Sequence, residues 1–201
     1  MYGSQPAIFP KMAASNTTES TTVDASASKL AVGRFEPGKI INMVDDNQTQ
    51  GSIMSELGTS LKVVLADTFV MYMMAHKYHF NVEGSDFFQL HDMFGQIYND
   101  LWSSLDTTGE HIRAQDEYVP FNFGRLMELA TWEDDNKIPT ASGMIEKLLD
   151  ANTQVIQSLN ASLEQAKIAN QEGVVNYLGA RLEIHGKHGW MLRATGKKNR
   201  S

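Results

Sequence analysis

The spacing of apolar residues is the feature that most constrains how this chain of 201 residues can fold. From residue 52 onward they recur at steps of three and four, which gathers them on one side of an α-helix. No stretch alternates apolar and polar residues as a half-buried β-strand does. The four predicted stripes are Leu61, Leu65, Phe69 and Tyr72; Phe87, Leu90, Phe94, Ile97, Leu101, Leu105 and Ile112; Ile145, Leu148, Val155, Leu159, Leu163 and Ala166; and Val174, Leu178, Leu182 and Trp190.

The breaks between these stripes give the expected topology. The first helix is predicted over about residues 52–81, and Ser85 is the expected N-cap of the second. A long connection with a short helix around residues 125–131 comes next, and the third helix is expected to end near Gly173. Four long amphipathic helices with one long crossover between the second and third are typical of an all-α, ferritin-like four-helix bundle.

The ends of the chain differ in composition from this bundle, which is assigned to residues 51–195. Residues 1–50 are rich in Ser, Thr, Ala, Asn and Gln and have no helical or alternating apolar period. Such a segment has little apolar surface to offset the entropy lost on ordering, so a disordered or extended arm is predicted. Its four Lys or Arg residues nearly balance its five Asp or Glu residues, which argues against a DNA-grasping arm.

Composition excludes several function classes. The chain has no cysteine, which rules out thiolate metal sites, iron–sulfur clusters, disulfides and a cysteine nucleophile, and fits a reducing compartment. We therefore expect a cytoplasmic protein, and association with the nucleoid is the alternative within the cytoplasm. The most apolar run, residues 61–75, contains Asp67 and is shorter than the roughly 20 residues of a spanning helix, so no membrane association is expected.

Charge argues against nucleic acid as the main partner. The formal net charge is -7, and basic residues cluster only at the C-terminal end, where residues 196–201 form a predicted basic tail. We therefore expect DNA binding to be weak. The cluster consists of Arg193, Lys197, Lys198 and Arg200.

Five residues are candidates for a metal site. His76 and His79 continue the stripe of the first helix, either as core histidines bonded to polar neighbours or as ligands. His91 lies early in the second helix. Asp106 and Glu110 lie late in it, one turn apart, either as a solvated face or as a carboxylate pair. A further pair near the end of the chain, His185 and His188, could bind a metal weakly, but such a pair near a helix end is more often structural, so it is not included in the site.

Helix geometry separates these candidates into two groups. His91 and Asp106 are fifteen residues apart, which is about 22 Å along a helix, so they cannot bind one metal within one chain. His79 and His91 flank the short break and can face each other across it. An antiparallel two-fold pairing of the second helix would bring the histidines of one chain to Asp106 and Glu110 of its mate. Imidazole and carboxylate ligands without sulfur suit non-haem iron.

The common di-iron motif of helical bundles is absent. That motif places Glu three residues before His on one helical face. None of the six histidines has Glu at that position, so an iron centre inside the bundle of one chain is not expected.

Several motifs resemble the signature of the Dps family, the DNA-binding proteins from starved cells or mini-ferritins. The resemblance covers about residues 52–195. The matching motifs are His79-Phe-Asn-Val-x-Gly84, Phe88-x-Leu-His91-x-x-Phe94, Tyr98, Asp106-Thr-x-x-Glu110 and His188-x-Trp190-Met-Leu-Arg-Ala194.

The resemblance implies a ferroxidase centre between two subunits, with His79 and His91 from one chain and Asp106 and Glu110 from the other. It also implies a homo-oligomer, a hollow dodecamer, that oxidises ferrous iron with hydrogen peroxide or oxygen. The ferric mineral is then stored inside, which limits oxidative damage. The alternative is a structural or DNA-compacting shell with an impaired centre.

The sequence departs from the family pattern at three positions. Phe80 follows the first histidine where the family commonly has Trp. Gly95 stands where an acidic residue often supports a second iron. Asn176 stands where an Asp usually lines the three-fold pore, so the iron uptake route is expected to be less acidic or to use other residues such as Glu172.

Overall fold

The computed structural model describes residues 46–134 and 136–197. Most of the predicted arm, residues 1–45, lies outside the described residues, as do residues 198–201 of the basic tail. The disordered arm and the domain boundaries therefore stay predictions.

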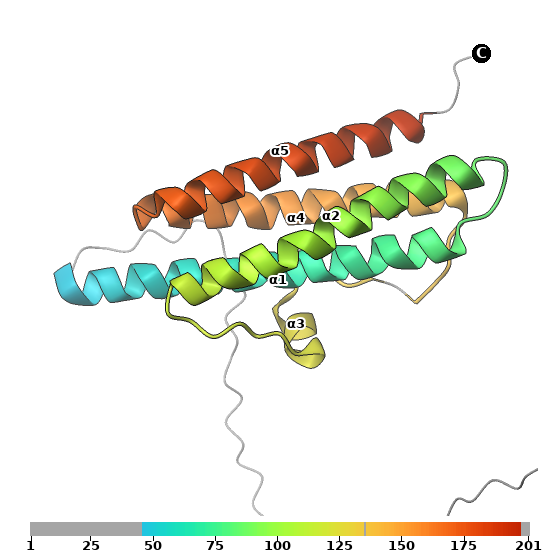
Figure 1. Cartoon of the computed structure of the whole chain (residues 1–201). Coiled ribbons are helices and arrows are strands. Elements are labelled where there is room, and N and C mark those ends of the chain that lie inside the picture. Colours follow the sequence, from blue (N-terminus) through green and yellow to red (C-terminus); the bar gives the residue numbers. More distant parts are fainter. Residues whose placement is uncertain (1–45, 135, 198–201) are drawn as a thin grey trace, which may run out of the picture. The chain divides into compact units, whose positions relative to one another are not determined.

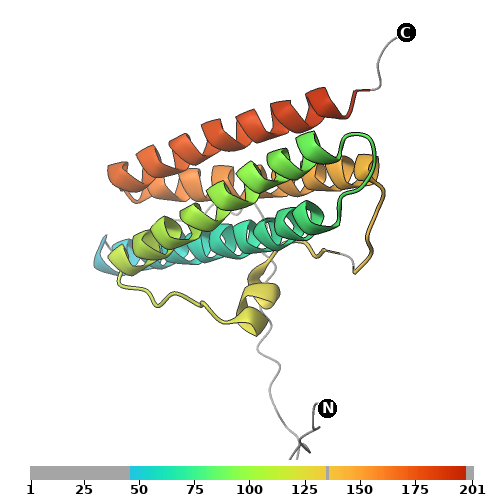
Figure 2. The ribbon, with the colours of Figure 1, turned by 45° about the vertical axis from the view of Figure 1, so that its right-hand side comes forward.

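The described residues form five α-helices and no strand, which confirms the predicted ferritin-like four-helix bundle. The helices are α1 (Asp46–Asn81), α2 (Phe87–Ala114), α3 (Phe123–Leu129), α4 (Ala141–Ile168) and α5 (Glu172–Thr195). The four long helices lie side by side, and α1 and α2 form a hairpin, as do α4 and α5 (Figures 1 and 2). The crossover from α2 to α4 carries the short helix α3 outside the bundle, next to α1 (Figure 1).

Three predicted helix ends were wrong. The first helix begins at Asp46 and not near residue 52. The N-cap of α2 is Asp86 and not Ser85, and its side chain makes no capping hydrogen bond. The preceding turn depends on Gly84, whose φ of 109° is costly for any residue with a side chain. The third long helix ends at Ile168, because the chain turns through Asn170 with φ 55°.

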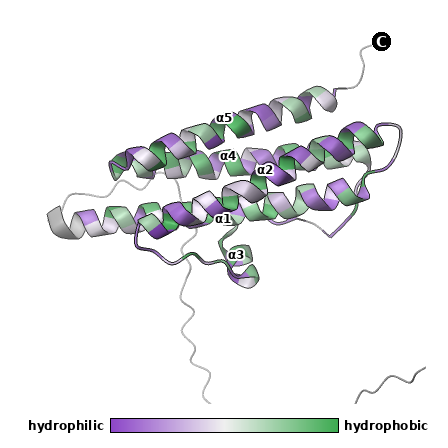
Figure 3. Cartoon of the chain, viewed as in Figure 1, coloured by the Kyte–Doolittle hydropathy of each residue, from purple (hydrophilic) through white to green (hydrophobic). Residues whose placement is uncertain are grey.

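The bundle core follows the predicted stripes on α2 and α4 and departs from the prediction on α5. The stripe of α2 from Leu90 to Ile112 is buried. On α5, however, Trp190 is 62% exposed and Leu182 is only half-buried. The side chains that α5 buries are Val174, Leu178, Arg181, His185, His188 and Leu192. Figure 3 shows polar and apolar residues mixed along this helix. Three of the buried residues are polar or charged, so polar groups enter the bundle interior.

The segment of α1 from Gln50 to Asn81 is long and apolar enough to cross a membrane by length and composition alone. In the bundle, 67% of its most apolar window is buried against the protein itself, as in the core helix of a water-soluble bundle. Asp67 is fully buried there and accepts hydrogen bonds from the backbone N–H and hydroxyl of Thr131, at 2.7 and 3.0–3.1 Å. Burial raises the pKa of Asp67. These bonds tie the crossover to α1.

Candidate metal centre

His79 and His91 face each other across the α1–α2 hairpin, as the sequence predicted. The Nδ1 atom of each ring lies 2.8 Å from the backbone carbonyl oxygen of the other residue. A carbonyl oxygen only accepts, so each Nδ1 carries the hydrogen and each Nε2 keeps a lone pair. The two rings stack with their centroids 3.7 Å apart. Fixing the tautomer through the second nitrogen is how proteins prepare histidines for a metal.

The packing around this histidine pair is tight. Phe87 stacks on His91 with ring centroids 5.1 Å apart. Gly95 is buried beneath His79, and a Cβ atom there would lie 3.3 Å from the Nδ1 atom of that ring. The glycine therefore lets His79 lie close against α2, and it offers no side chain that could bind a second iron.

Asp106 and Glu110 lie near the other end of α2. Both are exposed, and within the described part of the chain neither makes a hydrogen bond or an ion pair. They line a pocket of about 900 Å³ together with Trp102, Arg113 and Phe121. The two carboxylates outnumber the one guanidinium in the lining, that of Arg113, so the pocket keeps a net negative charge that favours a cation.

We call the His79–His91 pair and the Asp106–Glu110 pair the two candidate half-sites; they are about 22 Å apart along α2. No group of three or more His, Asp or Glu side chains among the described residues could hold a metal ion. That the two half-sites come together between two chains stays a prediction.

His76 is not a core residue, and the predicted inner stripe on α1 was wrong beyond Leu65. Phe69, Tyr72, His76 and His79 are only half-buried in the subunit. The His76 ring stacks on Phe80 and Tyr98, with centroids 4.5 and 4.1 Å away. Partial burial, with a smaller contribution from His79, lowers the pKa of His76.

Exposed aromatic side chains, which we call the aromatic face, lie next to both half-sites. Its members belong to α1, α2 and the crossover, and each exposes more than half of its surface: Phe80, Phe88, Trp102, Phe121 and Phe123. Clustered exposed rings of this size usually mark a surface that another protein covers.

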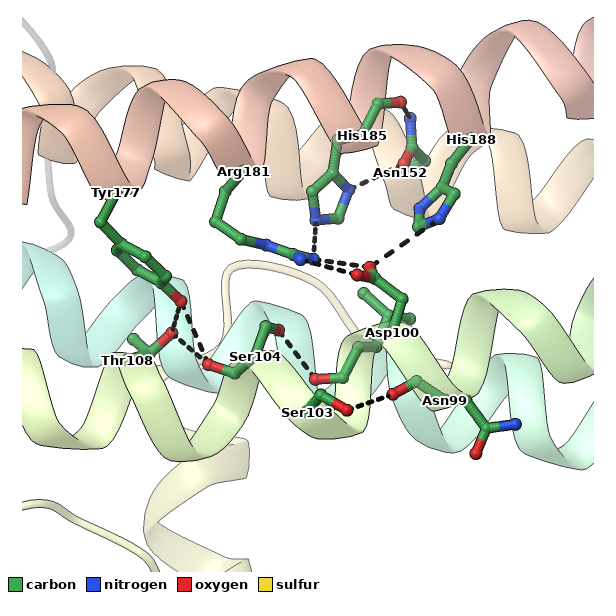
Figure 4. A network of polar contacts seen from close by, with 11 residues as sticks. Asn99, Asp100, Ser103, Ser104, Thr108, Asn152, Tyr177, Arg181, His185 and His188 are labelled. Atoms are coloured by element: carbon green, nitrogen blue, oxygen red, sulfur yellow. Dashed lines mark hydrogen bonds and ion pairs between the residues drawn. The ribbon is translucent and has the colours of Figure 1, made fainter.

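A buried polar network crosses the bundle between α2, α4 and α5, and sequence reasoning missed its centre. The guanidinium of Arg181 donates two hydrogen bonds to the carboxylate of Asp100, at 2.9 and 2.8 Å (Figure 4). Burial alone would raise the pKa of Asp100, but Arg181 and the nearby histidines hold it below its ordinary value. The signal was available, because Arg181 falls on the spacing Leu178, Arg181, His185.

His185 and His188 belong to this network, which supports their predicted structural role. His185 Nδ1 lies 2.8 Å from Asn152 Oδ1, and Asn152 donates back to the carbonyl oxygen of His185 at 3.0 Å (Figure 4). Burial and the charge of Arg181 lower the pKa of His185 to about 3, so the ring is neutral. A neutral histidine beside a guanidinium is a poor place for a metal cation.

Comparison with known proteins gives the class. The family model of the ferritin-like domain matches residues 59–200, and the chain belongs to that family. General stress protein 20U of Bacillus subtilis is 29% identical over 65% of this chain and 90% of its own length. DNA protection during starvation protein 2 of Bacillus anthracis is 28% identical over 65% of this chain and 89% of its own.

Comparison with solved structures shows which group of ferritin-like proteins the chain is most like in fold. A Dps protein from Vibrio cholerae O1, described as a member of a broad superfamily of ferritin-like diiron-carboxylate proteins, is 26% identical. It aligns with a TM-score of 0.70 over 73% of this chain and 92% of its own. With the motifs of both half-sites, these relatives assign the chain to the Dps family.

Proposed function

We propose that this protein oxidises Fe²⁺ and stores the ferric product in a shell built from copies of itself. The observation that carries the proposal is the pair of reciprocal hydrogen bonds between His79 and His91, which prepares two Nε2 lone pairs. Asp106 and Glu110, exposed and unpaired within the described residues, supply the carboxylates that iron prefers as further ligands.

The two half-sites join when two chains pair through the aromatic face with their α2 helices antiparallel. His79 and His91 of one chain then bind the same Fe²⁺ as Asp106 and Glu110 of the second copy. Two-fold symmetry makes two such sites in each pair. The histidines orient the ion, and the carboxylates stabilise the higher charge of the Fe³⁺ that forms. A dodecamer, the assembly implied by the Dps resemblance, would enclose the mineral.

Iron uptake in this proposal uses Glu172 in place of the missing pore carboxylate. Asn176, at the expected pore position, is exposed on α5 and carries no charge. Glu172 is exposed one helical turn earlier on the same helix, in its first turn. A carboxylate there would attract Fe²⁺ to the same end of α5.

The first prediction is ferroxidase activity that zinc blocks. Purified protein should speed the oxidation of Fe²⁺ by hydrogen peroxide, and the ferric product should stay soluble. Zn²⁺ favours the same imidazole and carboxylate ligands, binds them more tightly than Fe²⁺ and is not oxidised, so it should slow the reaction. Absorbance of the ferric product measures both effects. A rate equal to that of protein-free buffer would contradict the proposal.

The second prediction is weak DNA binding. Several relatives are named for DNA protection or DNA binding, but this chain carries a net charge of -7. Non-specific binding requires Lys and Arg to neutralise phosphates, and salt weakens it. Gel shifts at about 150 mM salt should therefore retain little duplex DNA. Tight binding at that salt would overturn this expectation, and its loss on deleting residues 196–201 would assign it to the tail.

A further inference from the structure

A continuous series of aromatic contacts joins the two half-sites within each chain. The Tyr98 ring meets His79 edge-on, with centroids 5.1 Å apart. Tyr98 in turn contacts Tyr72 at 6.4 Å, and Tyr72 contacts Trp102 at 5.3 Å. Trp102 lines the pocket that contains Asp106 and Glu110. Oxidisable rings therefore span the distance between the histidine half-site and the carboxylate half-site of the same chain.

Tyr72, in the middle of this series, also has a neighbouring base that can accept its phenolic proton. The hydroxyl of Tyr72 lies 3.2 Å from Nδ1 of His76. When His76 carries its hydrogen on Nε2, the phenol donates to Nδ1. A tyrosine loses an electron most easily when its proton can pass to a base that is already hydrogen-bonded to it. Phe80 and Tyr98 hold the His76 ring between them by stacking.

The number of electrons in the reaction explains why a path for electrons between the two half-sites would be useful. Hydrogen peroxide accepts two electrons, whereas each Fe²⁺ gives one. The site proposed above has ligands for one iron, because Gly95 provides no carboxylate for a second. One Fe²⁺ converts peroxide only to hydroxide and a hydroxyl radical, which attacks whatever lies nearest. The second electron must come from another Fe²⁺, and each chain reaches one at its other half-site.

We propose that Tyr98, Tyr72 and Trp102 form an electron relay between the two iron sites of a subunit pair. This inference rests on the proposed function. Fe²⁺ held by His79 and His91 and one peroxide give Fe³⁺, hydroxide and a hydroxyl radical. The radical takes the phenolic hydrogen atom of Tyr98 and becomes water.

The relay then restores Tyr98. An electron from Fe²⁺ held by Asp106 and Glu110 passes through Trp102 and Tyr72 to the tyrosyl radical, and a proton from solvent completes the phenol. Across the pair of sites, two Fe²⁺, one peroxide and one proton become two Fe³⁺, one hydroxide and one water. No hydroxyl radical is released.

Two variants interrupt the relay with little change in packing. Tyr72→Phe and Trp102→Phe keep an aromatic ring but remove the oxidisable group. Tyr118→Phe and Trp190→Phe are matched controls, because both residues are exposed and have no ring contact with the relay among the described residues. Size-exclusion chromatography confirms assembly. If Trp102→Phe does not assemble, Tyr72→Phe interrupts the same path and decides the question.

The measurements are Fe²⁺ oxidised per peroxide in the presence of a spin trap, the amount of trapped hydroxyl radical, and electron paramagnetic resonance of rapidly frozen samples. Wild type and controls should oxidise two Fe²⁺ per peroxide and show a transient tyrosyl or tryptophanyl signal. The relay variants should fall toward one Fe²⁺ per peroxide with more trapped radical. If wild type oxidises iron and the relay variants match it in all three measurements, the relay is wrong. If wild type itself does not speed iron oxidation, the proposed function fails first.

Discussion

Under the proposed function, a mixture of two inactive variants is expected to regain about a quarter of the complete iron sites, and with them about a quarter of the initial rate of Fe²⁺ oxidation, because each site would draw its ligands from two chains. One variant carries His79→Ala and His91→Ala, and the other carries Asp106→Ala and Glu110→Ala. Alone, each leaves every site without half of its ligands and should be nearly inactive. After unfolding, equal mixing and reassembly, a site is complete only when the first variant supplies its carboxylates and the second its histidines.

The fraction follows from random pairing, which gives one half times one half. Asp92→Ala provides the matched control, since Asp92 is an exposed acid on the same helix and lies outside the pocket that Asp106 and Glu110 line. Mass spectrometry of isolated assemblies establishes that the chains mix. Mixed assemblies without activity would mean that one chain supplies all the ligands, and the antiparallel pairing would be wrong.

The second large effect is expected at Asp100, and it concerns the stability of the fold and not the oxidation of iron. Its carboxylate is 27% exposed and its partner Arg181 only 8% exposed, so Asp100→Ala leaves a buried guanidinium without a counter-charge. Breaking such a pair from one side costs about 3–5 kcal/mol of unfolding free energy. Chemical denaturation should show this loss, and Asp92→Ala should not. Replacing both partners, as in Asp100→Leu with Arg181→Met, should recover much of it, because no unpaired charge is left.

Acid should weaken the same network. The pKa of His185 is about 3 in the folded protein against 6.5 for a free histidine. Between these pH values His185 binds a proton in the unfolded chain but not in the folded one. The free energy of unfolding should therefore fall as the pH drops from about 6.5 toward 3. Asp100, whose pKa lies below its ordinary 3.8, adds a further loss below that pH. His185→Gln should reduce the slope above pH 4, and an unchanged slope would show that other groups carry it.

Periodicity predicted the helices well, because an amphipathic helix must turn its apolar residues toward the core. It failed where the buried residues are polar. On α5 the spacing pointed to Leu182 and Trp190, whereas the bundle buries Arg181, His185 and His188. A polar residue is stable inside only if a partner meets it, and Arg181 meets Asp100 from 81 residues away. Nothing local in the sequence reveals such a partner.

For the candidate site, the hairpin was predictable and the aromatic face was not. His79 and His91 are twelve residues apart around a short break, which limits where their side chains can go. His76 continues the same helical spacing as the core, so the pattern left open whether it is a core residue or a ligand. It is half-buried because the aromatic face has no cover within the described part of the subunit.

The separation of the two half-sites also determines when iron chemistry can begin. Under the proposed function, a newly made subunit has both kinds of ligand but at opposite ends of α2, so it cannot oxidise iron alone. Pair formation depends on subunit concentration by mass action, and activity should rise more steeply than the amount of protein when protein is scarce. Ferric product then appears only on paired chains, the units from which a closed container for it is built.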